Sequence, residues 1–187
     1  MGQHFWLNIP NVITVGRVFA VPFMVWLILT HDLHAAFWLF VAAGISDGVD
    51  GYLAKILQAR TRIGAFLDPI ADKLLLVSAF LTLGVQGLLP LWLVIMVVFR
   101  DFAIVLGAAL IEILTRDLKM APNFSSKVNT TVQIVLVSVL LGVHGLSVQG
   151  MDWAVTGLIY ATALTTLVSG LIYLYQWGIT ISQANGD

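Results

Sequence analysis

Six long apolar stretches alternate with short polar connections along this chain. Each is about as long as the roughly 20 residues that an α-helix needs to cross a hydrocarbon core of about 30 Å. They lie near residues 10–30, 35–58, 65–85, 89–115, 124–144 and 151–178. The pattern therefore predicts six transmembrane helices. A short aromatic segment at residues 4–7 precedes the first stretch, and it predicts a short N-terminal interfacial helix lying along the membrane surface.

Composition supports this interpretation and narrows it. The chain has 187 residues, of which 59% are apolar and 10% charged, and its mean hydropathy is +0.97. Because a soluble domain carries about 25% charged residues, we predict an all-α integral membrane protein. The sequence has no cysteine, which excludes disulfides and thiol chemistry. It shows no repeat or low-complexity tract, so residues 1–187 are expected to form a single membrane domain.

The basic residues predict the orientation of the helices. Two connections, the second to third and the fourth to fifth, contain or adjoin Lys55, Arg60, Arg62, Arg116, Lys119 and Lys127. The other three connections contain no lysine or arginine. By the positive-inside rule, both termini and the two basic connections face the cytoplasm, or the matrix in a mitochondrion. The expected location is a bacterial inner membrane or the mitochondrial inner membrane, in contact with membrane lipids and with no nucleic acid partner.

Four aspartates lie inside two of the apolar stretches, where charge is costly and usually functional. Asp47 and Asp50 are three residues apart, and Asp68 and Asp72 are four apart, so each pair shares one face of its helix. Four carboxylates in a low-dielectric place require cations to stay ionised. All-oxygen ligand sets suit Mg²⁺, Mn²⁺ or Ca²⁺ better than zinc. The sequence therefore predicts a divalent-metal site below the cytoplasmic surface.

The spacing of these acids resembles the signature of the CDP-alcohol phosphotransferase family. The motif here is Asp47-x2-Asp50-Gly51-x2-Ala54-Lys55-x8-Gly64-x3-Asp68-x3-Asp72. Lys55 stands where the family has arginine, and the other seven specified positions match. The resemblance implies a six-helix homodimer in which the four aspartates hold two divalent cations, Mg²⁺ or Mn²⁺. It also implies that a hydroxyl acceptor displaces CMP from a CDP-linked lipid, with Asp72 as the general base.

Several further residues are expected to bind the CDP-lipid. Small side chains at Gly51 and Ala54 would let a nucleotide approach the helix backbone, and Lys55 would add a point charge for the phosphates. The resemblance to the family extends to further positions of the CDP-lipid site. They are Asn11, Thr14 and Arg17 in the first stretch, and Thr61 and Gly64 at the second connection.

The later stretches resemble the cardiolipin synthase branch of the family, in Phe99-Arg100-Asp101 and in the run from Phe124 to Gln133. The phosphatidylglycerophosphate synthase branch instead has an arginine in place of Ala108 and a lysine in place of Asn129. Neutral residues there suit a phosphodiester acceptor better than doubly charged glycerol 3-phosphate. We therefore expect CDP-diacylglycerol and phosphatidylglycerol to give cardiolipin and CMP, with Arg100, Lys127 and Asn129 binding the acceptor. Phosphatidylglycerophosphate synthase is the alternative.

Three other interpretations stay open. The aspartates could be structural, paired with Lys55, Lys73 or Arg100 in a helix bundle, and Arg100 could be neutralised by its neighbour Asp101. A cation transporter would use the acids as a conduction path. However, the outer halves of the second and third stretches, AAFWLFVAAG and LVSAFLTLG, contain no ionisable side chain. A non-catalytic lipid-binding or assembly factor is expected to lose one of the acids, and all four are present.

Overall fold

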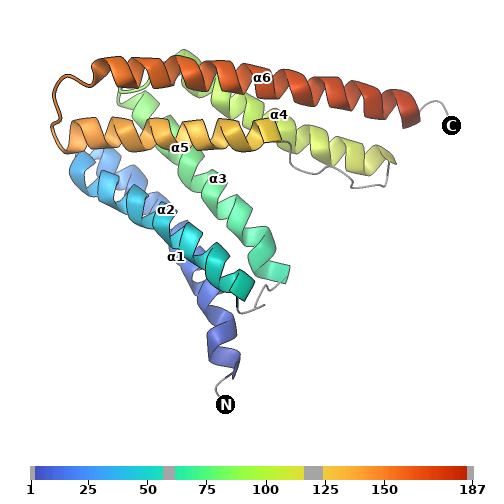
Figure 1. Cartoon of the computed structure of the whole chain (residues 1–187), viewed down its shortest axis with the longest axis horizontal. Helices are drawn as coiled ribbons and strands as arrows, with labels where there is room; N and C mark the ends of the chain where they lie inside the picture. The colour runs from blue at the N-terminus through green and yellow to red at the C-terminus, as the bar shows by residue number, and fades with distance from the viewer. Residues whose placement is uncertain (1–2, 57–61, 116–123, 185–187) are drawn as a thin grey trace. The chain divides into compact units, whose positions relative to one another are not determined.

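The structure, a computed structural model, describes residues 3–56, 62–115 and 124–184, and it places side chains for residues 16–48, 70–107 and 124–179. Within these ranges the chain forms six α-helices and no strand (Figure 1). The helices are α1 (Gln3–Leu29), α2 (Leu33–Ile56), α3 (Arg62–Val85), α4 (Leu91–Thr115), α5 (Phe124–Gly145) and α6 (Asp152–Ala184). The predicted all-α fold is confirmed, and the helices follow the six apolar stretches.

The first helix differs from the prediction. α1 runs without interruption from Gln3, so residues 4–7 are its first turns and do not form a separate interfacial helix. The physical reason is that nothing between residues 3 and 9 ends a helix. Pro10 removes one backbone hydrogen bond, a loss that long apolar helices tolerate.

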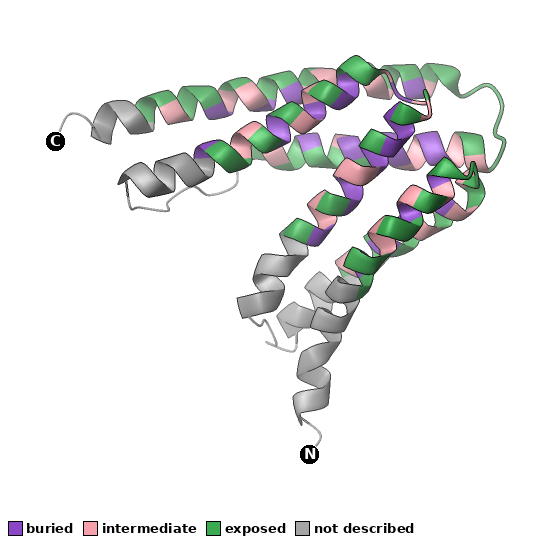
Figure 2. Ribbon diagram, turned by 180° about the vertical axis from the view of Figure 1, so that it is seen from behind, coloured by how far each residue is buried: buried purple, intermediate pink, exposed green. Residues whose placement is uncertain are grey.

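Two of the described helices are long and apolar enough to cross a membrane by themselves. They are Phe124–Gly145 and Asp152–Ile179, and shorter apolar segments, Gly16–Leu29 and Leu33–Gly48, lie in α1 and α2. In the most apolar windows of the two long helices, only 33% and 22% of the residues are buried. Most residues in these windows are therefore exposed or only partly buried (Figure 2).

The chain divides into two compact units, which are described separately. The first contains Met1–Leu89 and Val137–Gln149, and the second contains Pro90–Leu136 and Gly150–Asp187. In the first unit α1 packs against both α2 and α3. Its core consists of fully buried side chains from these three helices: Met24, Ile28, Ala36, Ala71, Ala79, Phe80 and Leu83.

The turn between α1 and α2 is closed by side chains and by one glycine. Asp32 caps α2, because its Oδ1 accepts a hydrogen bond from the Ala35 amide at 3.1 Å. Gln86 caps the other side, since its Nε2 donates to the carbonyls of Ile28 and Leu29 at 3.2 and 3.1 Å. Gly145 of α5 packs so closely that a Cβ there would lie 2.5 Å from the Leu33 carbonyl oxygen. This end of the unit is therefore tightly fixed.

In the second unit α4 and α6 run parallel, with matching positions in contact along their length. The rings of Trp92 and Tyr160 lie 6.5 Å apart near the start of both helices. Near the other end, Gly107 faces the ring of Trp177, leaving no room for a larger side chain. Arg100 lies between these contacts, in the middle of α4, and α5 brings Ser126 to it. The unit therefore surrounds a polar cluster with apolar contacts at both ends.

Candidate functional site

In the first unit two of the predicted metal ligands, on two different helices, contact the same arginine side chain on a third helix. The Nη1 atom of Arg17 on α1 lies 2.9 Å from Oδ1 of Asp47 on α2 and 2.6 Å from Oδ1 of Asp72 on α3. The Arg17 side chain is 2% exposed, whereas those of Asp47 and Asp72 are 48% and 43% exposed. The guanidinium is thus buried behind carboxylates that are open on their other side.

These contacts bear on whether the acids can hold a metal. Two carboxylate oxygens from different helices approach the same positively charged nitrogen, so the backbone already directs both acids at one cation. Carboxylate oxygen is the ligand type that Mg²⁺ and Mn²⁺ prefer. The two described acids thus offer oxygen ligands of the type that such a cation takes, and the metal site itself stays a prediction. Among the side chains that the structure places, no group of three potential metal ligands gathers. The side chains of Asp50 and Asp68 lie outside that set, so the four-aspartate ligand set stays a prediction.

The predicted CDP-lipid residues also lie outside the part that is described in atomic detail. They are Asn11, Thr14, Gly51, Ala54, Lys55, Thr61 and Gly64. Arg17, which the sequence associated with this nucleotide site, is described, and it contacts Asp47 and Asp72. The roles of the other residues stay predictions.

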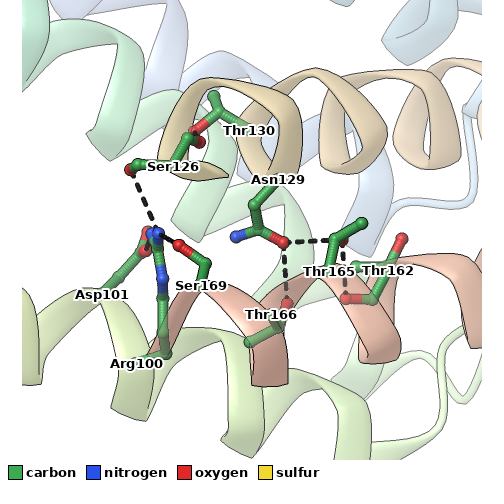
Figure 3. A network of polar contacts seen from close by, with 9 residues as sticks. All are labelled: Arg100, Asp101, Ser126, Asn129, Thr130, Thr162, Thr165, Thr166 and Ser169. Atoms are coloured by element: carbon green, nitrogen blue, oxygen red, sulfur yellow. Dashed lines mark hydrogen bonds and ion pairs between the residues drawn. The ribbon is translucent and has the colours of Figure 1, made fainter. Parts of the chain in front are cut away.

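The second unit contains a buried polar cluster around Arg100 (Figure 3). Arg100 is 6% exposed, and its Nη1 lies 2.8 Å from Oδ1 of Asp101. Its Nη2 donates to Ser126 of α5 at 3.0 Å and to Ser169 of α6. The ring of Tyr173 lies 5.8 Å from the guanidinium carbon. The ion pair with Asp101, considered above as a rival to acceptor binding, is therefore present, but it occupies only one side of the guanidinium.

Asn129 lies one helical turn from Ser126 on α5 and is fully buried. Its Oδ1 accepts hydrogen bonds from the hydroxyls of Thr165 and Thr166 on α6, both at 2.9 Å. Its Nδ2 is buried with no hydrogen-bond partner among the described residues, and so is the Nε of Arg100. Lys127, the third predicted acceptor residue, is exposed. Arg100 and Asn129 thus belong to one buried cluster, whereas the side chain of Lys127, next to Ser126 in sequence, is exposed.

α6 also contributes to this cluster, which the sequence did not predict. Thr162, Thr166 and Ser169 are buried, and they lie with Thr165 on one face of the helix. The signal was the spacing, since hydroxyl residues at i, i+3, i+4 and i+7 within an apolar stretch form one polar stripe.

Comparison with known sequences agrees with this description. A sequence model of the CDP-alcohol phosphatidyltransferase family matches residues 7–181. The CDP-diacylglycerol–glycerol-3-phosphate 3-phosphatidyltransferase of Bacillus subtilis is 35% identical over 89% of this chain and 93% of its own length. A probable cardiolipin synthase (CMP-forming) of Drosophila melanogaster is 33% identical over 90% of this chain and 57% of its own. The cardiolipin synthase (CMP-forming) of Rattus norvegicus is 30% identical over 96% of this chain and 64% of its own length.

By its fold and relatives, the chain is a helical transferase of substituted phosphate groups. It belongs to the CDP-alcohol phosphatidyltransferase family, as the aspartate motif predicted. The relatives divide between the names cardiolipin synthase and 3-phosphatidyltransferase. The chain spans just over half to nearly two thirds of the length of the two animal proteins.

Proposed function

We propose that the chain is a metal-dependent phosphatidyltransferase that joins CDP-diacylglycerol to phosphatidylglycerol, giving cardiolipin and CMP. The observation that carries the choice of acceptor is the low net charge of the cluster around Arg100, where one cation is paired with one carboxylate. The guanidinium is already shared with Asp101 at 2.8 Å, and Asn129 beside it is neutral.

A cluster with so little net charge suits an acceptor with one negative charge better than an acceptor with two. A phosphodiester carries one, whereas a phosphomonoester such as glycerol 3-phosphate carries about −1.5 to −2 at pH 7. Burying the additional charge beside a cation that is already paired is costly unless further cations are supplied. Lys127 is exposed, so its charge acts through solvent and helps a buried acceptor less than a buried cation would.

Asp47, Asp50, Asp68 and Asp72 would hold two divalent cations, Mg²⁺ or Mn²⁺, which when bound supply charge stabilisation for the phosphates. Asp72 accepts the proton of the acceptor hydroxyl, whose oxygen then bonds to the lipid-linked phosphorus of the CDP-lipid. The bond from that phosphorus to the bridging oxygen breaks, and CMP leaves with the bond's electron pair.

We further propose that all six helices span a membrane, with both ends and the acids on the cytoplasmic or matrix side, and that the protein is a homodimer. Large apolar side chains that are exposed on several helices support the membrane proposal, because water-facing surfaces rarely carry so many. They include Phe19, Phe23, Ile95, Phe99, Trp153, Leu171 and Tyr175.

Phosphatidylglycerophosphate synthase is the second candidate, and one observation favours it. The Bacillus protein that bears a glycerol-3-phosphate name is matched over 93% of its length, without an additional region. This candidate differs from the first only in the acceptor.

The test is CMP release from CDP-diacylglycerol by the purified protein in detergent, with Mn²⁺ or with EDTA. Phosphatidylglycerol, glycerol 3-phosphate or no acceptor is added, and the lipid product is identified by mass spectrometry. We expect cardiolipin with phosphatidylglycerol and Mn²⁺, and no reaction with EDTA. Faster turnover with glycerol 3-phosphate would move the assignment to the second candidate. CMP release with neither acceptor present would indicate hydrolysis and contradict both.

A further inference from the structure

In the buried cluster of the second unit, one side of the Asn129 amide is fully hydrogen-bonded and the other side is not. Two hydroxyls, those of Thr165 and Thr166, lie 2.9 Å from the same oxygen of Asn129. That carbonyl oxygen has two lone pairs, so its acceptor capacity is fully used. The amide nitrogen of Asn129 carries two N–H groups and is buried without a partner within the described part of the chain.

Burying a donor without an acceptor costs more free energy than a typical hydrogen bond contributes to stability. Five other buried side-chain atoms of this unit share that condition: the Nε of Arg100, the Nε2 of Gln133, the Nε1 of Trp177 and the hydroxyl oxygens of Ser125 and Thr162. The three nitrogens can only donate, and each hydroxyl also carries a proton that it can donate. Every one of these groups could be satisfied by an acceptor oxygen, so a ligand rich in acceptor oxygens would suit the cluster.

The location of the donors indicates where such a ligand would lie. Ser126, one turn before Asn129 on α5, contacts the guanidinium of Arg100 at 3.0 Å. Ser169, one turn after Thr165 and Thr166 on α6, contacts the same guanidinium. Figure 3 shows the Asn129 nitrogen on the side of its amide toward Arg100 and Ser169, with the oxygen toward the threonines. The free N–H groups of Asn129 and the cation thus belong to the same end of the cluster.

We propose that Thr165 and Thr166 are positioning residues for acceptor specificity. By holding the Asn129 oxygen they fix the amide orientation, so that its NH₂ group is offered to an oxygen of the acceptor's phosphodiester. This rests on the proposed function of Arg100 and Asn129 as the acceptor site. The new element is the role of α6. Its two threonines do not touch the acceptor, but they determine that the NH₂ group of Asn129 faces it.

The two threonines do not contribute equally. The Thr165 hydroxyl also lies 3.1 Å from the carbonyl of Thr162, so its single proton is shared between two acceptors. Thr166 makes the interaction with Asn129 from a fully buried position. Loss of the Thr166 hydroxyl should therefore weaken the orientation more than loss of the Thr165 hydroxyl.

The test is equilibrium binding of glycerophosphoglycerol, the deacylated phosphodiester headgroup, to the full-length protein in detergent by titration calorimetry. We expect the wild type to bind it, and Thr166→Val to bind it about tenfold more weakly, the effect of one oriented hydrogen bond. Thr165→Val should have a smaller effect. Thr166→Ser, which keeps the hydroxyl, should restore wild-type binding, and Asn129→Asp, which replaces the donor by a negative acceptor, should abolish it.

The matched control is Thr156→Val, the same change at an exposed position of α6, which should bind like the wild type. Thermal unfolding of each variant separates loss of binding from loss of fold. Equal affinity of the wild type and folded Thr166→Val, or no binding by the wild type, would overturn the inference. If Thr166→Val unfolds, the other two variants serve as the test. Wild-type affinity in folded Thr165→Val and folded Asn129→Asp would then overturn the inference. The measurement needs no turnover, so a protein that binds the headgroup but releases no CMP contradicts the proposed function alone.

Discussion

Arg17 Nη1 lies 2.6 Å from Oδ1 of Asp72, although the two residues are on different helices and 55 positions apart in sequence. The acid proposed as general base is therefore held by a cation from α1. The same nitrogen contacts Asp47 at 2.9 Å, so one guanidinium joins three helices of the first unit. A buried cation at this place does electrostatically what a bound divalent ion would do, which is to reduce the repulsion between the acids.

This relationship predicts a metal-dependent effect of Arg17→Gln. Without metal, the loss of the guanidinium leaves Asp47 and Asp72 to repel each other, and we expect a loss of about 1–2 kcal/mol because both carboxylates are half exposed. With Mn²⁺ present, the metal replaces that charge and the loss should be smaller. Thermal unfolding in EDTA and in Mn²⁺ measures both. Arg17→Lys, which keeps the charge, is the control, and an equal loss in both conditions would contradict the prediction.

Asp72→Asn should abolish turnover while largely retaining CDP-lipid binding. The substitution keeps the size of the side chain but removes the proton acceptor, and a general base contributes about 10²–10⁴-fold to rate. CMP release and equilibrium binding of CDP-diacylglycerol are measured on the same preparation. Asp152→Asn, at an exposed position in the first turn of α6, is the matched control. Full activity of Asp72→Asn would remove the general-base assignment.

The apolar stretches predicted the helices well because six long apolar runs separated by short polar connections set the number and approximate ends of the helices. They could not predict that α1 begins at Gln3, since an aromatic first turn looks the same in an interfacial helix and in a long one. Likewise, the motif placed Asp47 and Asp72 on helix faces, but their contact with Arg17 depends on how α1 packs between α2 and α3.

The polar cluster around Arg100 could be predicted from the sequence only in part. Arg100 and Asn129 were singled out because they lie in segments that resemble a family branch, whereas Thr165, Thr166 and Ser169 were overlooked. Threonine and serine are common in apolar helices, where they bond their own backbone, so each carries little signal alone. Only the structure shows that two of these hydroxyls bond Asn129, that of Thr165 in addition to the carbonyl of Thr162.

Gly145→Ala should destabilise the first unit. The added methyl carbon would lie 2.5 Å from the Leu33 carbonyl oxygen, and backbone atoms cannot move aside easily. We expect a loss of about 1–3 kcal/mol, as for other overpacked positions. Gly157→Ala is the matched control, because a Cβ there meets nothing within 4 Å and should stabilise α6 by up to about 1 kcal/mol. Thermal unfolding in detergent compares the two, and equal stability of both variants would show that the close approach is not rigid.

Ala108→Arg combined with Asn129→Lys should shift acceptor preference toward glycerol 3-phosphate. Asn129 is fully buried in a cluster where Arg100 is already paired with Asp101. A lysine in its place would add the second positive charge that a doubly charged phosphomonoester needs. Ala108 lies outside the described side chains, and its choice rests on the sequence resemblance alone. The measured quantity is the ratio of kcat/KM for glycerol 3-phosphate to that for phosphatidylglycerol, and we expect a rise of about tenfold or more. Lysine at position 129 also loses the amide oxygen that Thr165 and Thr166 hold, so phosphatidylglycerol use should fall at the same time. A variant that stays folded and keeps the wild-type ratio would mean that buried charge does not decide the acceptor.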